Sequence, residues 1–340
     1  MFNKIYKKIK DYILNNFIEI IILILMLFIT LYPVNYYIVT GGGIFDAKTR
    51  VSIKTDNKIK GSFNFSYVSE IKGTIFTYLL SYVVPSFERN SVEDSKSNEN
   101  ETVEDINFRN RIWLNQTNNI ATYVAYNRAG KTIKEKTVKN YVFYLDENAK
   151  TDLRVGDEII SISDNEISDI DEFKKIVNSR NVGDKVTIRV RRNNKEYERY
   201  AYIYLKDNTK YVGVVIIKDV VYKTDPSVKF KFKSSESGPS GGLILALQMY
   251  NMLIDKDITK GYKIAGTGMI NEDGSISEID GIKYKLNGAV NNKCDIFLAP
   301  SGDNYKEAVK EAKKNNYKIK IISVNSFDEA LEKLSNLKKK

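Results

Sequence analysis

Ser240 lies in the stretch GPSGG, directly before a long apolar run that reaches residue 253. The run predicts a mostly buried helix, so Ser240 would stand at or just before its first turn. Free backbone N–H groups and the positive end of the helix dipole point there and could stabilise a developing oxyanion. Ser240 could therefore attack a carbonyl group. On its own, however, a glycine-rich helix start equally fits a packing turn or an anion cradle.

The neighbours of Ser240 favour the close approach of a substrate. Gly238, Gly241 and Gly242 carry no side chain, so a substrate carbonyl group can come near the backbone. Pro239 stiffens the chain at this point. Gly238, Pro239 and Gly241 are therefore predicted to be supporting residues of the site.

The chain contains no histidine, so another group must take the proton of the serine. This absence excludes Ser-His-Asp and Cys-His catalysis, HExxH zinc sites and histidine pH switches. The candidate bases are Lys283 and Lys285. A lysine side chain has a pKa of about 10.4, but burial disfavours its charged form and can lower that pKa by several units. In a helix that starts at Gly281 the two lysines point to different sides, so one can face the core while the other is solvated.

Three blocks, GPSGGL, AGTGMINEDGSISEIDGIKYK and IFLAP, make residues 208–335 resemble the Lon-type serine-lysine peptidase domain. The resemblance implies that Ser240 is the nucleophile, Lys285 the general base and Thr267 the conserved threonine of the family. Thr267 lies in a tight GTG turn, where its hydroxyl group could orient a neutral lysine amine. Asp280 departs from the family pattern, in which a glycine is usual. Because a carboxylate would raise the pKa of Lys285, we expect Asp280 to point outward.

Residues 138–205 resemble a PDZ domain through LRVGDEIISI, a short amphipathic helix in IDEFKKIVNSR, and GDKVTIRVRR. The pattern predicts a strand in KNYVFYLD, a turn at Gly156-Asp157 and a hairpin that turns at Asn193-Asn194. A PDZ domain binds an extended peptide by strand addition. No carboxylate-binding glycine loop is evident in the sequence, so a spacer or regulatory domain is the alternative.

Residues 41–135 predict a region of strands and helices. Strands are expected in TRVSIKTD and KGSFNFSYVS, a helix or a buried strand over 71–85, and one helix over 106–129 that ends at Gly130. Residues 91–105 are polar and acidic and predict a solvated loop.

Residues 17–39 include the uncharged run IIILILMLFITLYPVNYYIV and predict a transmembrane helix, since about 20 helical residues span the hydrocarbon core. Tyr36 and Tyr37 fall near its far end, where aromatic side chains favour the interface. The lysines of residues 1–16 predict a basic cytoplasmic tail, with the catalytic domain extracellular. The apolar run is long for a signal peptide and no clear A-x-A site follows it, so we expect a retained single-pass anchor in the cell membrane.

The overall composition limits the partners of the chain. Its net charge is +10, but no basic cluster is interleaved with aromatic residues, so we expect no nucleic-acid partner. The single cysteine, Cys294, excludes an intrachain disulfide and a cysteine-based metal site, and it predicts a small buried hydrophobe. We expect neither a metal nor a cofactor.

The order of anchor, PDZ-like domain and Lon-type domain is similar to that of membrane-anchored PDZ-domain-containing Lon-like proteases of bacteria. ATP-driven Lon proteases carry an ATPase module, whereas this chain has no G-x-x-x-x-G-K-[ST] loop. The resemblance implies an α+β protein that acts without ATP. Its substrates would be peptides, exposed protein segments or unfolded chains, and homo-oligomer formation is compatible with the family.

Two alternatives belong to other functional classes. A non-catalytic peptide-binding scaffold would use the PDZ-like groove and carry a decayed protease domain, but Ser240, Thr267 and Lys285 are all present. A small-molecule kinase would use GPSGGLILAL as a phosphate loop, but that function leaves Lys285 and the PDZ-like domain unexplained. The protease prediction accounts for both.

Overall fold

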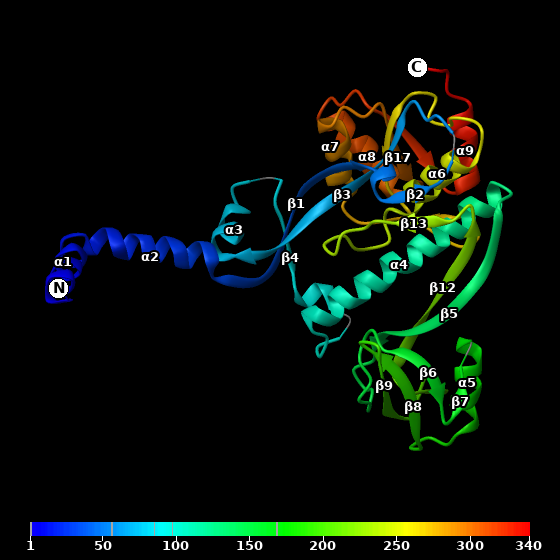
Figure 1. Cartoon of the computed structure of the whole chain (residues 1–340), viewed down its shortest axis with the longest axis horizontal. Helices are drawn as coiled ribbons and strands as arrows, with labels where there is room; N and C mark the ends of the chain where they lie inside the picture. Colours follow the sequence, from blue (N-terminus) through cyan, green and yellow to red (C-terminus); the bar gives the residue numbers. More distant parts are fainter. Residues whose placement is uncertain (1, 56, 85, 97, 168) are drawn as a thin grey trace. The chain divides into compact units, whose positions relative to one another are not determined.

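The computed structural model describes residues 2–55, 57–84, 86–96, 98–167 and 169–340 (Figure 1). The chain divides into two compact units. The first combines Met1–Gly41 with Ser69–Ser95, and the second combines Gly42–Val68 with Lys96–Lys340. Residue 85, at the end of the segment predicted as helix or strand, and residue 97, inside the predicted acidic loop, lie outside the described residues.

The first unit contains the predicted membrane anchor, but the apolar helix is shorter than the sequence suggested. Helix α1 spans Phe2–Asn15 and helix α2 spans Phe17–Leu31. Tyr32 takes an extended conformation (φ −69°, ψ 117°), because the ring of Pro33 disfavours helical geometry in the residue before it. The last part of the predicted span over 17–39 instead begins strand β1 (Pro33–Asp46).

Within the described part of the chain, no helix is by itself both long and apolar enough to cross a membrane. Only together do the helical segments Lys4–Asn15 and Phe17–Leu31 have the length and apolar composition of a membrane span, and the pair is bent by 76° at the break between them. With 15 residues, α2 extends about 22 Å, against roughly 30 Å for the hydrocarbon core of a bilayer. The prediction of one continuous helix over 17–39 is therefore wrong, and the apolar helix is α2 alone.

Strands β1 and β3 (Ser62–Thr74) have residues in both units. They run antiparallel, because Gly42 lies against Tyr67 while Gly73 lies against Tyr36. Helix α3 (Ile75–Leu80) follows β3 directly, so the segment 71–85 contains both a strand end and a helix. Strand β4 (Glu88–Ser91), antiparallel to β1, and the short 3-10 helix η2 (Glu93–Ser95) complete the first unit.

A mostly parallel sheet with the strand order β18-β17-β14-β3-β1 forms the centre of the second unit. Strands β14 (Lys263–Gly266), β17 (Ile296–Pro300) and β18 (Lys320–Val324) all run parallel to β3. Their side chains alternate between two apolar clusters, with Ile264 and Leu298 on one face and Ala265 and Phe297 on the other.

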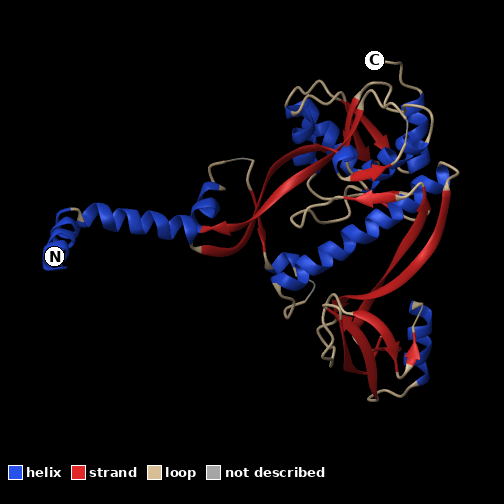
Figure 2. Ribbon diagram, in the orientation of Figure 1, coloured by secondary structure: helices blue, strands red, loops and turns tan. Residues whose placement is uncertain are grey.

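Helices cover both faces of this sheet (Figure 2). The face with Ile264 packs against α4 (Val103–Arg128), α6 (Gly242–Leu253) and α9 (Phe327–Ser335). The opposite face packs against α7 (Ile282–Asn291) and α8 (Asp303–Lys314). Short strands and turns complete the domain: η1 (Ala47–Thr49), β2 (Val51–Ile53), β13 (Val228–Phe230), β15 (Met269–Ile270) and β16 (Ile276–Ser277).

A second sheet, with the order β12-β5-β6-β8-β9, corresponds to the PDZ-like part of the chain. Its strands are β5 (Thr132–Leu145), β6 (Glu158–Ile162), β7 (Asn165–Glu166), β8 (Lys185–Arg192), β9 (Lys195–Tyr202) and β12 (Val214–Asp225). Helix α5 (Ile170–Ser179) lies between β7 and β8 in the sequence. The hairpin β8–β9 turns at Asn193 and Asn194, both with positive φ, as the sequence predicted. A separate ribbon joins β10 (Tyr204–Lys206) to β11 (Thr209–Tyr211).

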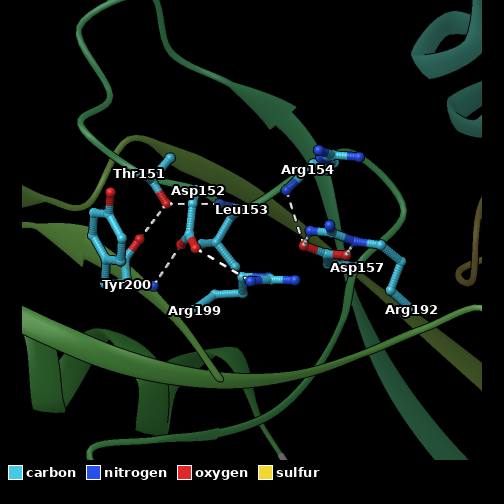
Figure 3. Close-up of polar contacts among 8 residues, drawn as sticks. All are labelled: Thr151, Asp152, Leu153, Arg154, Asp157, Arg192, Arg199 and Tyr200. Carbon is cyan, nitrogen blue, oxygen red and sulfur yellow. Dashed lines mark hydrogen bonds and ion pairs between the residues drawn. The ribbon is translucent and has the colours of Figure 1, made fainter. Parts of the chain in front are cut away.

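The turn before β6 is fixed by a buried carboxylate (Figure 3). The side chain of Asp157 accepts hydrogen bonds from Nε and Nη2 of Arg192, at 2.6 and 2.7 Å, and from the backbone N–H of Arg154 at 2.9 Å. A second carboxylate, Asp152, accepts from the N–H of Tyr200 and from Arg199. These contacts tie the segment that carries the LRVGD motif to β8 and β9.

Helix α4 connects the two sheets of the second unit. Thr102 and Asp105 form a capping box at its start, and Gly130 follows its end with φ +62°, so the predicted helix over 106–129 is confirmed with an earlier start. The predicted solvated loop over 91–105 is only partly right. Glu101 is buried and forms an ion pair with Arg109 of α4, and therefore this end of the loop is packed against the helix.

Candidate active site

The candidate nucleophile Ser240 is half-buried in the turn that precedes α6. The first helical N–H groups are already used, since Gly242 donates to Pro239 O at 3.2 Å and Leu243 to Gly268 O at 3.1 Å. The N–H groups of Ser240 and Gly241 have no acceptor among the residues that the structure describes. Two donors at the positive end of a helix can hold an oxyanion.

The glycines around Ser240 are required for different reasons. Gly238 has open space at its Cβ position, but its φ of +85° is a conformation that other residues rarely adopt. Glycine is therefore needed here for the backbone conformation and not for lack of space. Its N–H donates to Asn110 O of α4 at 3.2 Å, which ties the loop to that helix. A Cβ on Gly241 would lie 2.8 Å from ring carbons of Phe65, so this glycine is needed for packing against the protein as well as for substrate access.

Thr267 lies directly after β14 and is fully buried. Its Oγ1 donates to the backbone carbonyl of Ser240 at 3.0 Å, and the N–H of Gly268 donates to the same oxygen at 2.7 Å. Thr267 is itself held by its N–H, which donates to Leu298 O of β17 at 3.1 Å. The GTG turn therefore fixes the backbone of Ser240. The Thr267 hydroxyl group donates its hydrogen bond to the backbone carbonyl oxygen of Ser240. Its own oxygen can still accept a hydrogen bond from an amine.

The two candidate lysines have different surroundings, as the helix geometry predicted. Lys285 is buried on α7, with 4% of its surface exposed, whereas Lys283 is half-buried and its Nζ lies 4.7 Å from the ring centroid of Tyr284. Burial lowers the pKa of Lys285 to about 8, and the negative charge of Asp280 opposes this shift. Asp280 is exposed, as expected, but its charge still reaches Lys285.

Glycines bring α7 close to the first strands of the sheet. A Cβ on Gly281, which precedes α7 with φ +73°, would lie 3.0 Å from Val68 Cγ1 of β3. A Cβ on Gly288 would lie 3.0 Å from Gly43 O of β1. Lys285 therefore lies between two close contacts of α7 with these strands. The GTG turn follows the carboxyl end of β14, a place where α/β sheets commonly form ligand sites.

The structure joins Ser240 to Thr267 by a hydrogen bond, but it records none between Lys285 Nζ and Ser240 Oγ, both of which belong to described residues. Catalytic hydrogen bonds are often long in proteins without substrate and shorten when substrate binds. No group of three or more His, Cys, Asp or Glu side chains that could hold a metal ion occurs in the described ranges. Burial raises the pKa of the Cys294 thiol to about 11, as expected for a structural cysteine.

Sequence reasoning did not identify the residues that support the loop from outside its own motif. Asn110 and Thr117 of α4 contact Gly238 and Gly242, and Phe65 of β3 packs against Gly241. One signal was available, because residues 115–122 of α4 (NQTNNIAT) are uncharged and, apart from Ile120, small or polar. Such a stretch in a long helix indicates close packing against another element.

Comparison with known proteins gives two family matches. Residues 131–199 match the family model of the PDZ domain, and residues 185–336 match that of the Lon protease (S16) C-terminal proteolytic domain. Ser240, Thr267 and Lys285 all fall inside the second range. No curated protein matches the chain.

Solved structures similar to this chain include two Listeria domains. The PDZ domain of an SdrC-like protein from Listeria monocytogenes is 24% identical, and the match covers 23% of this chain and 86% of that one with a TM-score of 0.22. The second domain of another Listeria protein is 26% identical, and the match covers 23% of this chain and 83% of that one with a TM-score of 0.21.

Proposed function

Because the chain is a PDZ-containing Lon-like protease, we propose that it is a serine endopeptidase with Ser240 as nucleophile and Lys285 as general base. The observation that carries this proposal is the burial of Lys285, which brings its pKa to about 8 in a chain without histidine. A lysine with that pKa is partly neutral near physiological pH and can accept a proton.

The reaction follows from the roles of these groups. Neutral Lys285 takes the hydroxyl proton of Ser240 while the serine oxygen attacks the peptide carbonyl carbon. The N–H groups of Ser240 and Gly241 hold the resulting oxyanion. Lys285 then gives the proton to the leaving amine, and an acyl-enzyme remains. In the second half, Lys285 takes a proton from water, the hydroxide attacks the ester carbonyl, and Ser240 leaves with that proton.

The same proposal extends to substrate and place of action. Without a phosphate loop the enzyme cannot use ATP to unfold proteins, so it cleaves peptides, exposed segments or unfolded chains. The PDZ-like sheet ends in strand β12, an edge to which an extended peptide can add. We place the apolar helix α2 in the cell membrane, the N-terminus in the cytoplasm and the catalytic domain outside, and we include assembly into a homo-oligomer.

Cleavage of an unstructured protein substrate without ATP tests the proposal. Ser240→Ala should abolish cleavage, because no other group replaces the attacking oxygen. Ser237→Ala, at an exposed serine three residues upstream, is the matched control and should keep wild-type activity. If Ser240→Ala kept full activity, the assignment of the nucleophile would be wrong. If the wild type neither cleaved the substrate nor reacted with a fluorophosphonate, the non-catalytic peptide-binding scaffold would be favoured.

A further inference from the structure

Helix α3 exposes an unusual amount of apolar surface. Residues 73–84 (GTIFTYLLSYVV) carry no charged side chain. The exposed fractions of Phe76, Leu79, Tyr82 and Val83 are 48%, 55%, 63% and 74%, and α3 contains no buried residue. Contiguous apolar surface of this kind usually marks a site of contact with a membrane or a partner.

The position of α3 within the first unit indicates which of these it is. The N–H of Ile75, the first residue of α3, donates to Tyr32 O at 3.1 Å, directly after the end of α2 (Figure 1). Helices α2 and α3 are in contact. Helix α2 has no buried residue either, although all but two of its side chains are apolar, Glu19 and Thr30 being the exceptions. The apolar surface of α3 is therefore continuous with that of α2.

Three tyrosines, from β1 and from the segment of α3, gather beside this junction. The ring of Tyr36 lies 4.9 Å from that of Tyr78, and the ring of Tyr78 lies 5.6 Å from that of Tyr82. The guanidinium group of Arg89 lies 3.8 Å from the ring centroid of Tyr82. Tyrosine rings prefer the interface between water and hydrocarbon, and an arginine there can pair with lipid phosphate.

The length of α2 is consistent with a second membrane contact. At about 22 Å the helix is shorter than the hydrocarbon core, and flanking apolar or interfacial side chains at its ends can make up the difference. We propose that residues 75–84, together with the cluster of Tyr36, Tyr78, Tyr82 and Arg89, enter the interface of the lipid bilayer at the end of α2. This second contact rests on the proposed insertion of α2. It would hold the start of β1 and the end of β3 at the membrane surface.

The experiment uses tryptophan fluorescence of the full chain in lipid vesicles. Trp113 is the single tryptophan, and Trp113→Phe gives a silent background. Three probes are compared in it: Leu79→Trp in α3, Leu23→Trp in α2, and Val182→Trp at an exposed aliphatic site in the PDZ-like part. The vesicles contain phosphatidylcholine and phosphatidylglycerol, with or without bromine atoms on the acyl chains. Bromine quenches only tryptophans that contact the chains.

We expect the probes at 79 and 23 to lose most of their emission in brominated vesicles, with a blue-shifted maximum. The emission of the probe at 182 should be the same in brominated and unbrominated vesicles. Quenching at 23 without quenching at 79 would overturn the second contact and leave the anchor intact. Absence of quenching at both sites would overturn both. A blue-shifted probe at 79 that bromine does not quench, and whose shift depends on protein concentration, would indicate a second copy of the chain instead.

Discussion

Burial of Lys285 has two opposite consequences. It lowers the pKa of the amine to about 8, so the residue can act as a base. Below that pH, however, Lys285 carries a positive charge that burial separates from water, and this costs stability. The unfolded chain, in which the pKa is about 10.4, binds more protons than the folded one between these two values. Stability therefore rises with pH from about 8 to about 10.4, and at pH 7 the cost of protonated Lys285 is about 3 kcal/mol.

Replacement of this lysine should separate activity from stability. We expect Lys285→Met to abolish cleavage while raising the melting temperature of the catalytic domain at pH 7, because an apolar side chain of similar length avoids the cost of the buried charge. The gain should shrink as the pH approaches 10. Lys283→Met, at the half-buried neighbour, is the control and should show no such pH dependence. A lower melting temperature of Lys285→Met at pH 7 would contradict the lowered pKa of the buried Lys285.

Thr267 acts in this structure on the backbone of Ser240. Thr267→Val removes the hydrogen bond to the Ser240 carbonyl, worth about 1 kcal/mol, and so should lower kcat roughly fivefold to tenfold with KM little changed. Thr267→Ser keeps the hydroxyl group and should restore most of kcat. Steady-state kinetics on a short peptide would measure both. An equal loss in the serine variant would show that the methyl group, and not the hydrogen bond, matters.

Helices and turns hold these residues through contacts that lie far apart in the sequence. The loop with Ser240 is attached to α4 through Asn110 and to β14 through the GTG turn, and α4 also packs along β5 and β12. The side chain of Gln116 donates to Lys218 O of β12 at 2.9 Å, and the ring of Tyr123 stacks on that of Tyr222 at 5.5 Å. The nucleophile loop and the PDZ-like sheet therefore share one supporting helix.

The buried carboxylate of Asp157 joins the turn before β6 to β8 through Arg192. Asp157→Asn leaves Arg192 without its charge partner, and breaking a buried pair costs about 3–5 kcal/mol. Hydrogen exchange should show faster exchange in β6 and β8, while α6 and α7 keep their protection. The control is Asp152→Asn, at a more exposed carboxylate, which should change exchange little. Uniform loss of protection throughout the chain would show that the two sheets do not unfold separately.

At the scale of the whole molecule, sequence motifs predicted the domain types and supplied the candidate site residues, whereas long-range contacts could not be predicted. Ser240 and the pair of candidate lysines come from the residues themselves, whereas the choice of Lys285 and the role of Thr267 come from the resemblance to Lon-type peptidases. The Asn193-Asn194 hairpin follows from local backbone preference. Pro33 could have indicated the end of α2, because proline restricts the residue before it. The pairing of β12 with β5 and the partner of Thr267 depend on residues distant in sequence, which local patterns in a single sequence do not reveal.

The pairing of Ser240 with Lys285 is tested most directly by the rate at which a fluorophosphonate modifies the protein at different pH values. Mass spectrometry of the labelled chain should place the adduct on Ser240. The labelling rate should rise as the pH passes about 8, because Lys285 becomes neutral there, and Lys285→Met should remove both the rate and its pH dependence. An adduct on another serine, or a labelling rate that Lys285→Met leaves unchanged, would contradict the proposed dyad.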